Sequence, residues 1–265
     1  MKFEQYYLEC LSQASYLIAD TDSGVAAVVD PRRDIQTYLD DAAADGLEIR
    51  YVIETHFHAD FLSGHLELAE ATGAEIVYGA AAQAEYPIRR VTTGERIALG
   101  DPDTGVVLEF RETPGHTPES ISVVVWERGT DEQPFGVLTG DTLFIGDVGR
   151  PDLLGPEMTE PLAHAQWSSM RRLRDEVSHT ADLYPTHGFG SFCSATATVG
   201  TASTLAQQIA SNPAFHVDED TFVTELIAGL DAFPRYYPRW CRPLVRVPGL
   251  REVATWNLAL VLERR

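Results

Sequence analysis

The sequence predicts a mixed α/β protein built on a core of two sheets with helices on the outside. Two observations lead to this class. Along residues 1–190, short apolar runs alternate with amphipathic segments, a pattern typical of strands and helices that follow one another. The predicted strands are also too numerous and too irregularly spaced for a simple doubly wound sheet, and two packed sheets accommodate them better.

The N-terminal half contains the first of these elements. The expected strands are residues 15–20, 25–30, 49–56 and 75–79, and the expected helices are residues 34–46 and 62–73. The first helix has apolar side chains at helical spacing, Asp34 as its N-cap and Gly46 as its stop. The third strand is a β-branched run that ends at His56.

The second half continues this alternation of strands and helices, and its amino-acid composition then changes. Its expected strands are residues 106–116, 121–128, 135–141 and 181–188, and a helix is expected over 160–177. Beyond them lie a small, polar segment with a helix in its second half, another short helix at 222–230, and a stretch rich in Pro, Arg and aromatic residues at 232–249. We therefore divide the chain into a catalytic domain, 1–200, and an extension, 201–265. The extension is either packed on the main domain or a solvated linker.

Composition excludes several classes of function. The chain has 40 acidic and 20 basic side chains, a net charge of −20, so its surface repels nucleic-acid phosphates. It has no apolar run of about 18 residues, so no membrane span is expected. The N-terminus lacks the apolar stretch of a secretory signal, and the three cysteines are far apart and odd in number. We expect a cytoplasmic protein in a reducing compartment.

Ligand-type side chains lie at the ends of the apolar runs. Residues 55–65, THFHADFLSGH, hold several of them in one short stretch. Four predicted strands end in His56, His116, Asp141 and His187. Because a strand holds the side chain at its end in place while the loop beyond it stays open, we expect these four residues to meet along one rim of a sheet.

These motifs resemble a known family. T-H-x-H-x-D, P-G-H-T-P, T-G-D and Y-P-x-H follow one another over residues 5–190 as they do in the metallo-β-lactamase superfamily. The resemblance implies a four-layer αββα sandwich with a metal site at one edge. The longer stretches THFHADFLSGH, TPGHTPES, TGDTLFIGDVGRPDL and YPTHGFGS look like the persulfide dioxygenases related to the human ethylmalonic encephalopathy protein. They look closest to the bacterial members that are often fused to rhodanese, although no rhodanese domain is expected here.

Phe61 departs from the pattern of the hydrolases in this superfamily. Those enzymes hold two metals, and the second site uses the aspartate equivalent to Asp60, the histidine after it and the last histidine. A phenyl ring cannot bind a metal, so this second site is one imidazole short. Two readings stay open: a single metal, or a pair in which His65, one helical turn further along, replaces the missing ligand.

The resemblance to the dioxygenases assigns the metal ligands. It implies one Fe(II) per chain, held by His56, His116 and Asp141, with three positions free for substrate and dioxygen. The side chains expected to orient these ligands are His58, Asp60, His187 and His65. From the residues alone iron and zinc are both compatible, since imidazole and carboxylate suit either metal.

Three further residues are candidates for substrate binding. Arg150 looks like the family arginine that contacts the thiol carrier of the persulfide, and its alternative is a pair with Asp147 or Asp152. Tyr184 resembles a tyrosine near the substrate, or is a core tyrosine on a strand. Cys193 either takes part in sulfur transfer or is a small buried hydrophobe.

The resemblance implies oxidation of a low-molecular-weight persulfide, such as glutathione persulfide, by dioxygen to sulfite and free thiol in sulfide detoxification. A separate rhodanese is a candidate functional partner, and a homodimer is common in the family. The first alternative is a zinc-dependent thioester hydrolase of the glyoxalase II kind. The second is a non-catalytic module that senses sulfur or metal.

Overall fold

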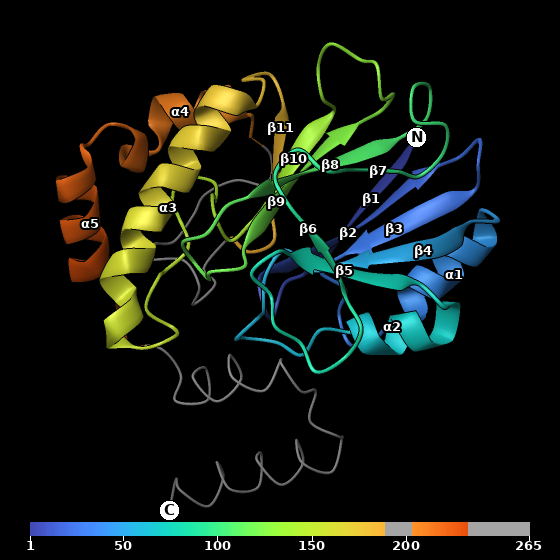
Figure 1. The fold of residues 1–265 in the computed structure, drawn as a ribbon, viewed down its shortest axis with the longest axis horizontal. Helices are drawn as coiled ribbons and strands as arrows, with labels where there is room; N and C mark the ends of the chain where they lie inside the picture. The colour runs from blue at the N-terminus through green and yellow to red at the C-terminus, as the bar shows by residue number, and fades with distance from the viewer. Residues whose placement is uncertain (189–202, 233–265) are drawn as a thin grey trace, which may run out of the picture.

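Two β-sheets lie face to face at the centre of the structure, a computed structural model that describes residues 1–188 and 203–232 (Figure 1). Helices cover the outer faces of both sheets, so the layers run helix, sheet, sheet, helix. This confirms the predicted α/β class and the four-layer sandwich.

The first sheet has six strands in sequence order. They are β1 (Lys2–Leu8), β2 (Gln13–Asp20), β3 (Val25–Val29), β4 (Glu48–Ile53), β5 (Glu75–Gly79) and β6 (Arg89–Val91). The first three are antiparallel, and β3 to β6 are parallel. Every residue of β2 and β3 is buried, because one face of this sheet packs on the second sheet and the other on helices. Continuous apolar runs are typical of strands covered on both faces.

The second sheet has five strands in the order β11-β10-β9-β8-β7. They are β7 (Arg96–Ala98), β8 (Val107–Glu112), β9 (Ile121–Trp126), β10 (Gly136–Gly140) and β11 (Asp182–Pro185). All neighbours are antiparallel except β10 and β11, which are parallel and are connected through helix α3 (Pro156–Glu176). After α3 the chain returns to the second sheet and adds β11 as the edge strand beside β10.

The core has one apolar layer between the sheets and one under the helices on each side. Ile18 of β2 and Phe110 of β8 belong to the central layer and are fully buried. Helices α1 (Gln36–Ala44) and α2 (His65–Thr72) cover the first sheet, where Tyr38 and Leu68 belong to one cluster with the strands. Helix α3 covers the second sheet in the same way through Met170.

Some local expectations were wrong, and three strands were missed. The strand predicted to end at His56 ends at Ile53, so His56 lies on the loop beyond it. Asp34 is not the N-cap of α1; the N-cap is Ile35, which makes no side-chain capping bond. The short strands β6 and β7 and the N-terminal strand β1 were not predicted, because their sequences are short or half polar.

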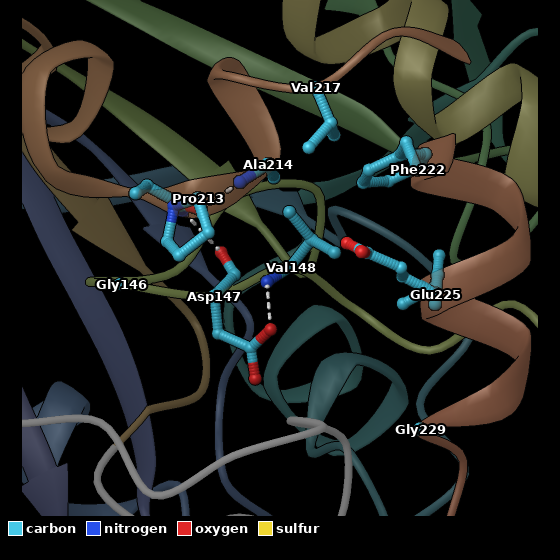
Figure 2. A pocket seen from close by; sticks show the side chains of 11 residues that line it. Gly146, Asp147, Val148, Pro213, Ala214, Val217, Phe222, Glu225 and Gly229 are labelled. Atoms are coloured by element: carbon cyan, nitrogen blue, oxygen red, sulfur yellow. Dashed lines mark hydrogen bonds between the residues drawn. The ribbon is translucent and has the colours of Figure 1, made fainter. Parts of the chain in front are cut away.

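The described part of the extension packs against the main domain. It contains α4 (Leu205–Ser211), the 3-10 helix η1 (Pro213–Phe215) and α5 (Glu219–Ala228), whose buried side chains share a cluster with α3. Asn212 Nδ2 donates to the Asp147 carbonyl at 3.1 Å. A pocket of about 260 Å³ lies between the loop around Asp147 and α5 (Figure 2). The predicted boundary at residue 200 and the segment 233–265 lie outside the described residues.

In the described part of the chain, no helix combines the length and the apolar character that crossing a bilayer requires.

Candidate metal centre

The predicted ligand residues come from the ends of strands in both sheets. His56 lies three residues after β4, in the first sheet. From the second sheet, His116 lies on the loop after β8, Asp141 directly follows β10, and His187 comes two residues after β11. The structure brings all four together at one edge of the sandwich, and all four are buried.

Two glycines let the backbone approach closely at this edge. Gly140 has a positive φ of 54°, and a Cβ there would lie 2.8 Å from Thr55 Oγ1. At Gly115 a Cβ would lie only 1.9 Å from Gln166 Oε1 of helix α3. Glycine is required at both positions for His116 and Asp141 to reach the site.

His56, His116 and Asp141 form a compact set of three potential ligands. Asp141 Oδ2 lies 3.7 Å from His56 Nε2 and 3.6 Å from His116 Nε2. Neither Nε2 atom has a hydrogen-bond partner, although both are buried. Atoms bound to one ion at about 2 Å are separated by distances of this order. The residues therefore fit a metal held by two imidazoles and one carboxylate.

Hydrogen bonds on the other ring nitrogen fix the tautomer of each histidine. His116 Nδ1 lies 2.8 Å from the Arg150 carbonyl, which can only accept, so Nδ1 carries the proton. The Thr55 hydroxyl donates to Asp30 Oδ2 at 2.7 Å, so its oxygen accepts from His56 Nδ1 at 2.9 Å. Both Nε2 atoms thus keep their lone pairs for a metal.

Electrostatics keeps His56 neutral. Burial and the neighbouring imidazole of His58 hold the pKa of His56 well below its usual value. A neutral imidazole is the form that binds metals.

His187 joins two carboxylates. Its Nδ1 lies 2.8 Å from Asp141 Oδ1 and its Nε2 lies 2.8 Å from Asp60 Oδ2. Burial opposes the charged form, but the carboxylates of Asp141 and Asp60 outweigh it and raise the pKa of His187 well above its usual value. The imidazolium fixes the orientation of Asp141 through one ring nitrogen and pairs with Asp60 through the other.

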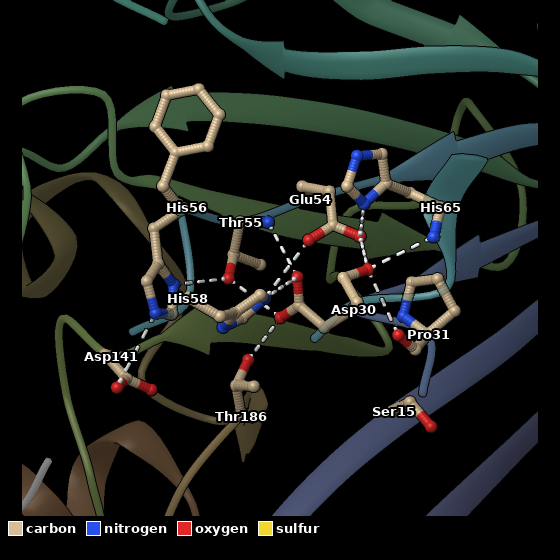
Figure 3. A network of polar contacts seen from close by, with 12 residues as sticks. Ser15, Asp30, Pro31, Glu54, Thr55, His56, His58, His65, Asp141 and Thr186 are labelled. Atoms are coloured by element: carbon tan, nitrogen blue, oxygen red, sulfur yellow. Dashed lines mark hydrogen bonds and ion pairs between the residues drawn. The ribbon is translucent and has the colours of Figure 1, made fainter. Parts of the chain in front are cut away.

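His58 points toward a second pair of carboxylates (Figure 3). Its Nε2 lies 3.2 Å from both Asp30 Oδ1 and Glu54 Oε2. Burial opposes the charged form, but these carboxylates raise the pKa of His58 to about 10. These two contacts hold the ring of His58 in place beside the other histidines of the site.

The sequence-based search missed Asp30 and Glu54. Both are buried and both lie at the end of an apolar strand, the position at which the other polar residues of the site were found. Asp30 follows β3 with a positive φ of 50° and joins Thr55 to Thr186, whose hydroxyl also donates to it. The same signal, a polar residue at the end of an apolar run, would have found them.

Phe61 and His65 do not supply the missing ligand. The centroid of the Phe61 ring lies 4.4 Å from that of His58 and 6.0 Å from that of His187, so the phenyl ring packs against the two histidines. His65 opens helix α2, with its Nε2 2.9 Å from the Tyr86 hydroxyl and its Nδ1 3.6 Å from Glu54. No group of potential ligand atoms among the described residues contains both His65 and Asp60, so His65 does not complete a second site in this structure.

Potential ligand atoms form three overlapping groups within residues 1–188 and 203–232. One is the set described above. The other two are His56, His58 and His187, and Asp30, Glu54 and His58. Both of these use the imidazole of His58, whose pKa is raised by the carboxylates of Asp30 and Glu54. In the set with Asp141, hydrogen bonds at Nδ1 leave Nε2 of both histidines available to a metal.

Two of the three candidate substrate-binding residues contact protein side chains in the structure. Arg150 is buried, and its guanidinium forms two bonds with Asp152, at 2.7 and 2.8 Å, as its alternative reading expected. Tyr184 stacks on Phe135, with ring centroids 5.9 Å apart, and packs at the core between the sheets. Cys193 lies outside the described residues. The roles of these residues in substrate binding stay predictions.

Comparisons with known proteins agree with this fold. The model of the metallo-beta-lactamase superfamily matches residues 8–187. A curated hydroxyacylglutathione hydrolase of Rhodospirillum rubrum is 33% identical over 161 residues, which are 60% of this chain and 56% of that protein. The chain thus spans about half the length of this relative.

Two crystal structures are similar over most of the chain. A metallo-beta-lactamase from Staphylococcus aureus is 33% identical with a TM-score of 0.85, covering 94% of this chain and 73% of that one. ETHE1 from Myxococcus xanthus is 25% identical with a TM-score of 0.74, covering 92% and 96%.

Proposed function

Because this chain belongs to the metallo-beta-lactamase superfamily, we propose that it is a persulfide dioxygenase that depends on a single Fe(II). The reaction joins a thiol persulfide, dioxygen and one water and gives free thiol, sulfite and two protons. The terminal sulfur is oxidised, dioxygen is reduced, and the bond between the two sulfurs breaks.

One observation carries this proposal. His56 and His116 present unpartnered Nε2 atoms to the Asp141 carboxylate. The Nε2 atoms of His58 and His187 lie within ion-pair distance of other carboxylates. Asp60 is paired with His187, and the next residue is Phe61, whose phenyl ring cannot bind a metal. A site for one ion with two imidazoles and one carboxylate is typical of non-haem iron oxygenases.

The chain's own residues hold and orient the site. Iron in such a set supplies open coordination positions and one-electron chemistry with dioxygen. Thr55 and the Arg150 carbonyl fix the two imidazoles, and the His187 imidazolium fixes the carboxylate of Asp141. All three ligand side chains are buried, which shields the reacting atoms from bulk water.

Asp141→Ala tests the ligand assignment. Removing this carboxylate should abolish iron binding and reduce oxygen consumption with glutathione persulfide to background, because two imidazoles alone hold Fe(II) poorly. Metal analysis and an oxygen electrode measure the two effects. Asp103→Ala, on an exposed loop, is the matched control and should behave as wild type. Oxygen uptake by the Asp141 variant at the wild-type rate would refute the assignment.

A zinc-dependent thioester hydrolase is the second candidate. The curated relative named hydroxyacylglutathione hydrolase favours it, since that name describes cleavage of a glutathione thioester. This candidate predicts two zinc ions per chain and hydrolysis of a thioester without oxygen. The dioxygenase predicts about one iron per chain and oxygen uptake that requires a persulfide.

We place the reaction in the cytoplasm, where the reducing conditions expected from the cysteine pattern also maintain free thiols. A homodimer and a separate rhodanese remain the proposed partners.

A further inference from the structure

The loop between β10 and α3 passes directly against two of the three proposed metal ligands. A Cβ at Gly149 would lie 2.0 Å from the Asp141 carbonyl oxygen and 3.1 Å from His116 Cβ, so only glycine fits at this point of the loop. The next residue, Arg150, supplies the carbonyl to which His116 Nδ1 donates at 2.8 Å. The position of this loop therefore decides how the His116 ring is held.

Two amide side chains of the extension hold the loop a few residues before Gly149. Gln208 Oε1, on α4, accepts from the Gly146 N–H at 2.7 Å. Asn212 Nδ2, four residues further along, donates to the Asp147 carbonyl at 3.1 Å. Both amides are buried, so the loss of either side chain would leave a backbone group of the loop without its partner and away from water.

Each amide is anchored within the extension by its other end. Gln208 Nε2 donates to Ser203 Oγ at 2.7 Å, and Asn212 Oδ1 accepts from the Ala214 N–H at 3.1 Å. Because both ends of each amide are bonded, neither side chain can turn away without breaking a second hydrogen bond. The two amides therefore transmit the position of the extension to the loop.

The far end of the loop is bonded to the extension as well. Arg150 Nη2 donates to the Asp231 carbonyl, beyond α5, at 2.7 Å. The same guanidinium pairs with Asp152 of the main domain. The residue whose carbonyl holds His116 is thus fixed between the main domain and the extension.

From these contacts we infer that Gln208 and Asn212 are positioning residues for the metal centre. By holding the loop, they keep the Arg150 carbonyl where it fixes the His116 ring with Nε2 toward the metal. The inference gives the extension a part in metal binding and goes beyond the proposed reaction. It concerns the site that holds the ion, so it applies whichever reaction the ion serves.

Gln208→Leu and Asn212→Leu remove the two amides with little change in volume. We expect each to lower metal affinity about tenfold, the lower end of the range for a residue that bonds a ligand directly, because here the effect passes through the loop. Competition with a chelator of known affinity measures the change, with Fe(II) in the absence of oxygen and with Zn(II). Gln208→Glu keeps an oxygen for the Gly146 N–H, and the Ser203 hydroxyl can donate to its carboxylate, so this variant should recover most of the affinity.

Asp218→Ala is the matched control for a general loosening of the extension. Asp218 is the exposed N-cap of α5, and its carboxylate accepts from the Thr221 N–H at 2.8 Å. It lies at the opposite end of α5 from Asp231, which bonds the loop. Removing this cap should lower the Tm of the protein and leave its metal affinity at the wild-type value.

The ring signal of His116 reports the same effect without any metal. In metal-free protein, nitrogen-15 NMR detects the Nδ1–H groups of His116 and His56, because each is buried and hydrogen-bonded. Gln208→Leu and Asn212→Leu should shift or broaden the signal of His116. The signal of His56, which bonds Thr55 on the first sheet's side of the site, should stay unchanged.

Three results would overturn the inference: unchanged metal affinity in both leucine variants, an equal loss of affinity in Asp218→Ala, or a His116 signal that does not move. A different result separates it from the proposed reaction. If oxygen uptake with a persulfide is absent but metal affinity still depends on Gln208 and Asn212, the dioxygenase proposal fails and the positioning role stands.

Discussion

The hydroxyl group of Thr55 connects a buried carboxylate to a metal ligand. It donates to Asp30 and accepts from His56 Nδ1, which leaves His56 Nε2 free. Removing a residue that hydrogen-bonds a metal-binding histidine commonly lowers metal affinity about 10–100-fold.

Thr55→Val removes this hydroxyl with little change in volume. We expect the metal affinity to fall about 10–100-fold, because His56 loses the bond that fixes its tautomer. Competition with a chelator of known affinity measures the change. Thr55→Ser keeps the hydroxyl and should restore most of the affinity. Equal affinities for Thr55→Val and wild type would show that the hydrogen bond does not orient the ligand.

Substitution of Phe61 distinguishes a site for one metal ion from a site for two. Phe61→His adds an imidazole next to His58 and His187, so we expect the protein to retain more than one zinc per chain after loading with excess zinc. Metal analysis of the desalted protein measures the ratio. Phe61→Leu removes the ring without adding a ligand, and its ratio should stay near one. If the histidine variant also stays near one, another feature excludes the second ion.

The sequence predicted which residues meet at the site more fully than it predicted what each contacts. His56, His116, Asp141 and His187 were expected along one rim and lie there, because strand ends are visible as the ends of apolar runs. The direction of the His58 ring was not predictable. It depends on Asp30 and Glu54, which reach it only through the packing of neighbouring strands.

At the scale of single elements, strands covered on both faces were the easiest to predict. β2 and β3 are continuous apolar runs and were expected within two residues of their observed bounds. β1 is a half-polar edge strand with no such run. β4 stops at Ile53, before His56, because the chain there leaves the sheet to form the metal-binding loop.

Asp20 connects the turn after β2 to the start of β8. Its carboxylate accepts from the backbone N–H of Ser23 at 2.8 Å and of Val106 at 2.9 Å. Burial opposes the charged form, but these backbone donors outweigh it and hold the pKa of Asp20 below its usual value. The carboxylate therefore stabilises the fold above the unfolded pKa, about 3.9, and this contribution is lost as the pH falls through the lower folded pKa.

Asp20→Asn should lower the free energy of unfolding by about 1–3 kcal/mol at neutral pH, because a charged acceptor is replaced by a neutral one. Urea unfolding measures the change, and the difference from wild type should shrink as the pH is lowered toward about 3. Asp103→Asn, on an exposed loop, should show little change. A difference that stays constant over this pH range would mean that the charge of Asp20 is not the cause.

At the scale of the whole molecule, the candidate metal centre joins the two sheets. His56 extends from the first sheet, whereas His116 and Asp141 extend from the second. The two-sheet core was predictable from the number and spacing of the apolar runs. The pairing of particular strands across the sandwich was not, since it is set by packing between residues far apart in the sequence, such as Ile18 and Phe110.

An ion bound between the sheets should stabilise the entire fold. Without a metal, the two Nε2 atoms are buried and unpartnered, and metal binding satisfies both. Free metal at about 100 times its dissociation constant adds about 2.7 kcal/mol, which corresponds to a rise of roughly 5–10 °C in Tm for a chain of this size. Calorimetry of metal-free protein, with and without added Fe(II) under anaerobic conditions, measures this shift. Asp141→Ala lacks the carboxylate from the second sheet, so its Tm should not respond. If added Fe(II) does not change the Tm of the wild type either, the ion does not hold the two sheets together.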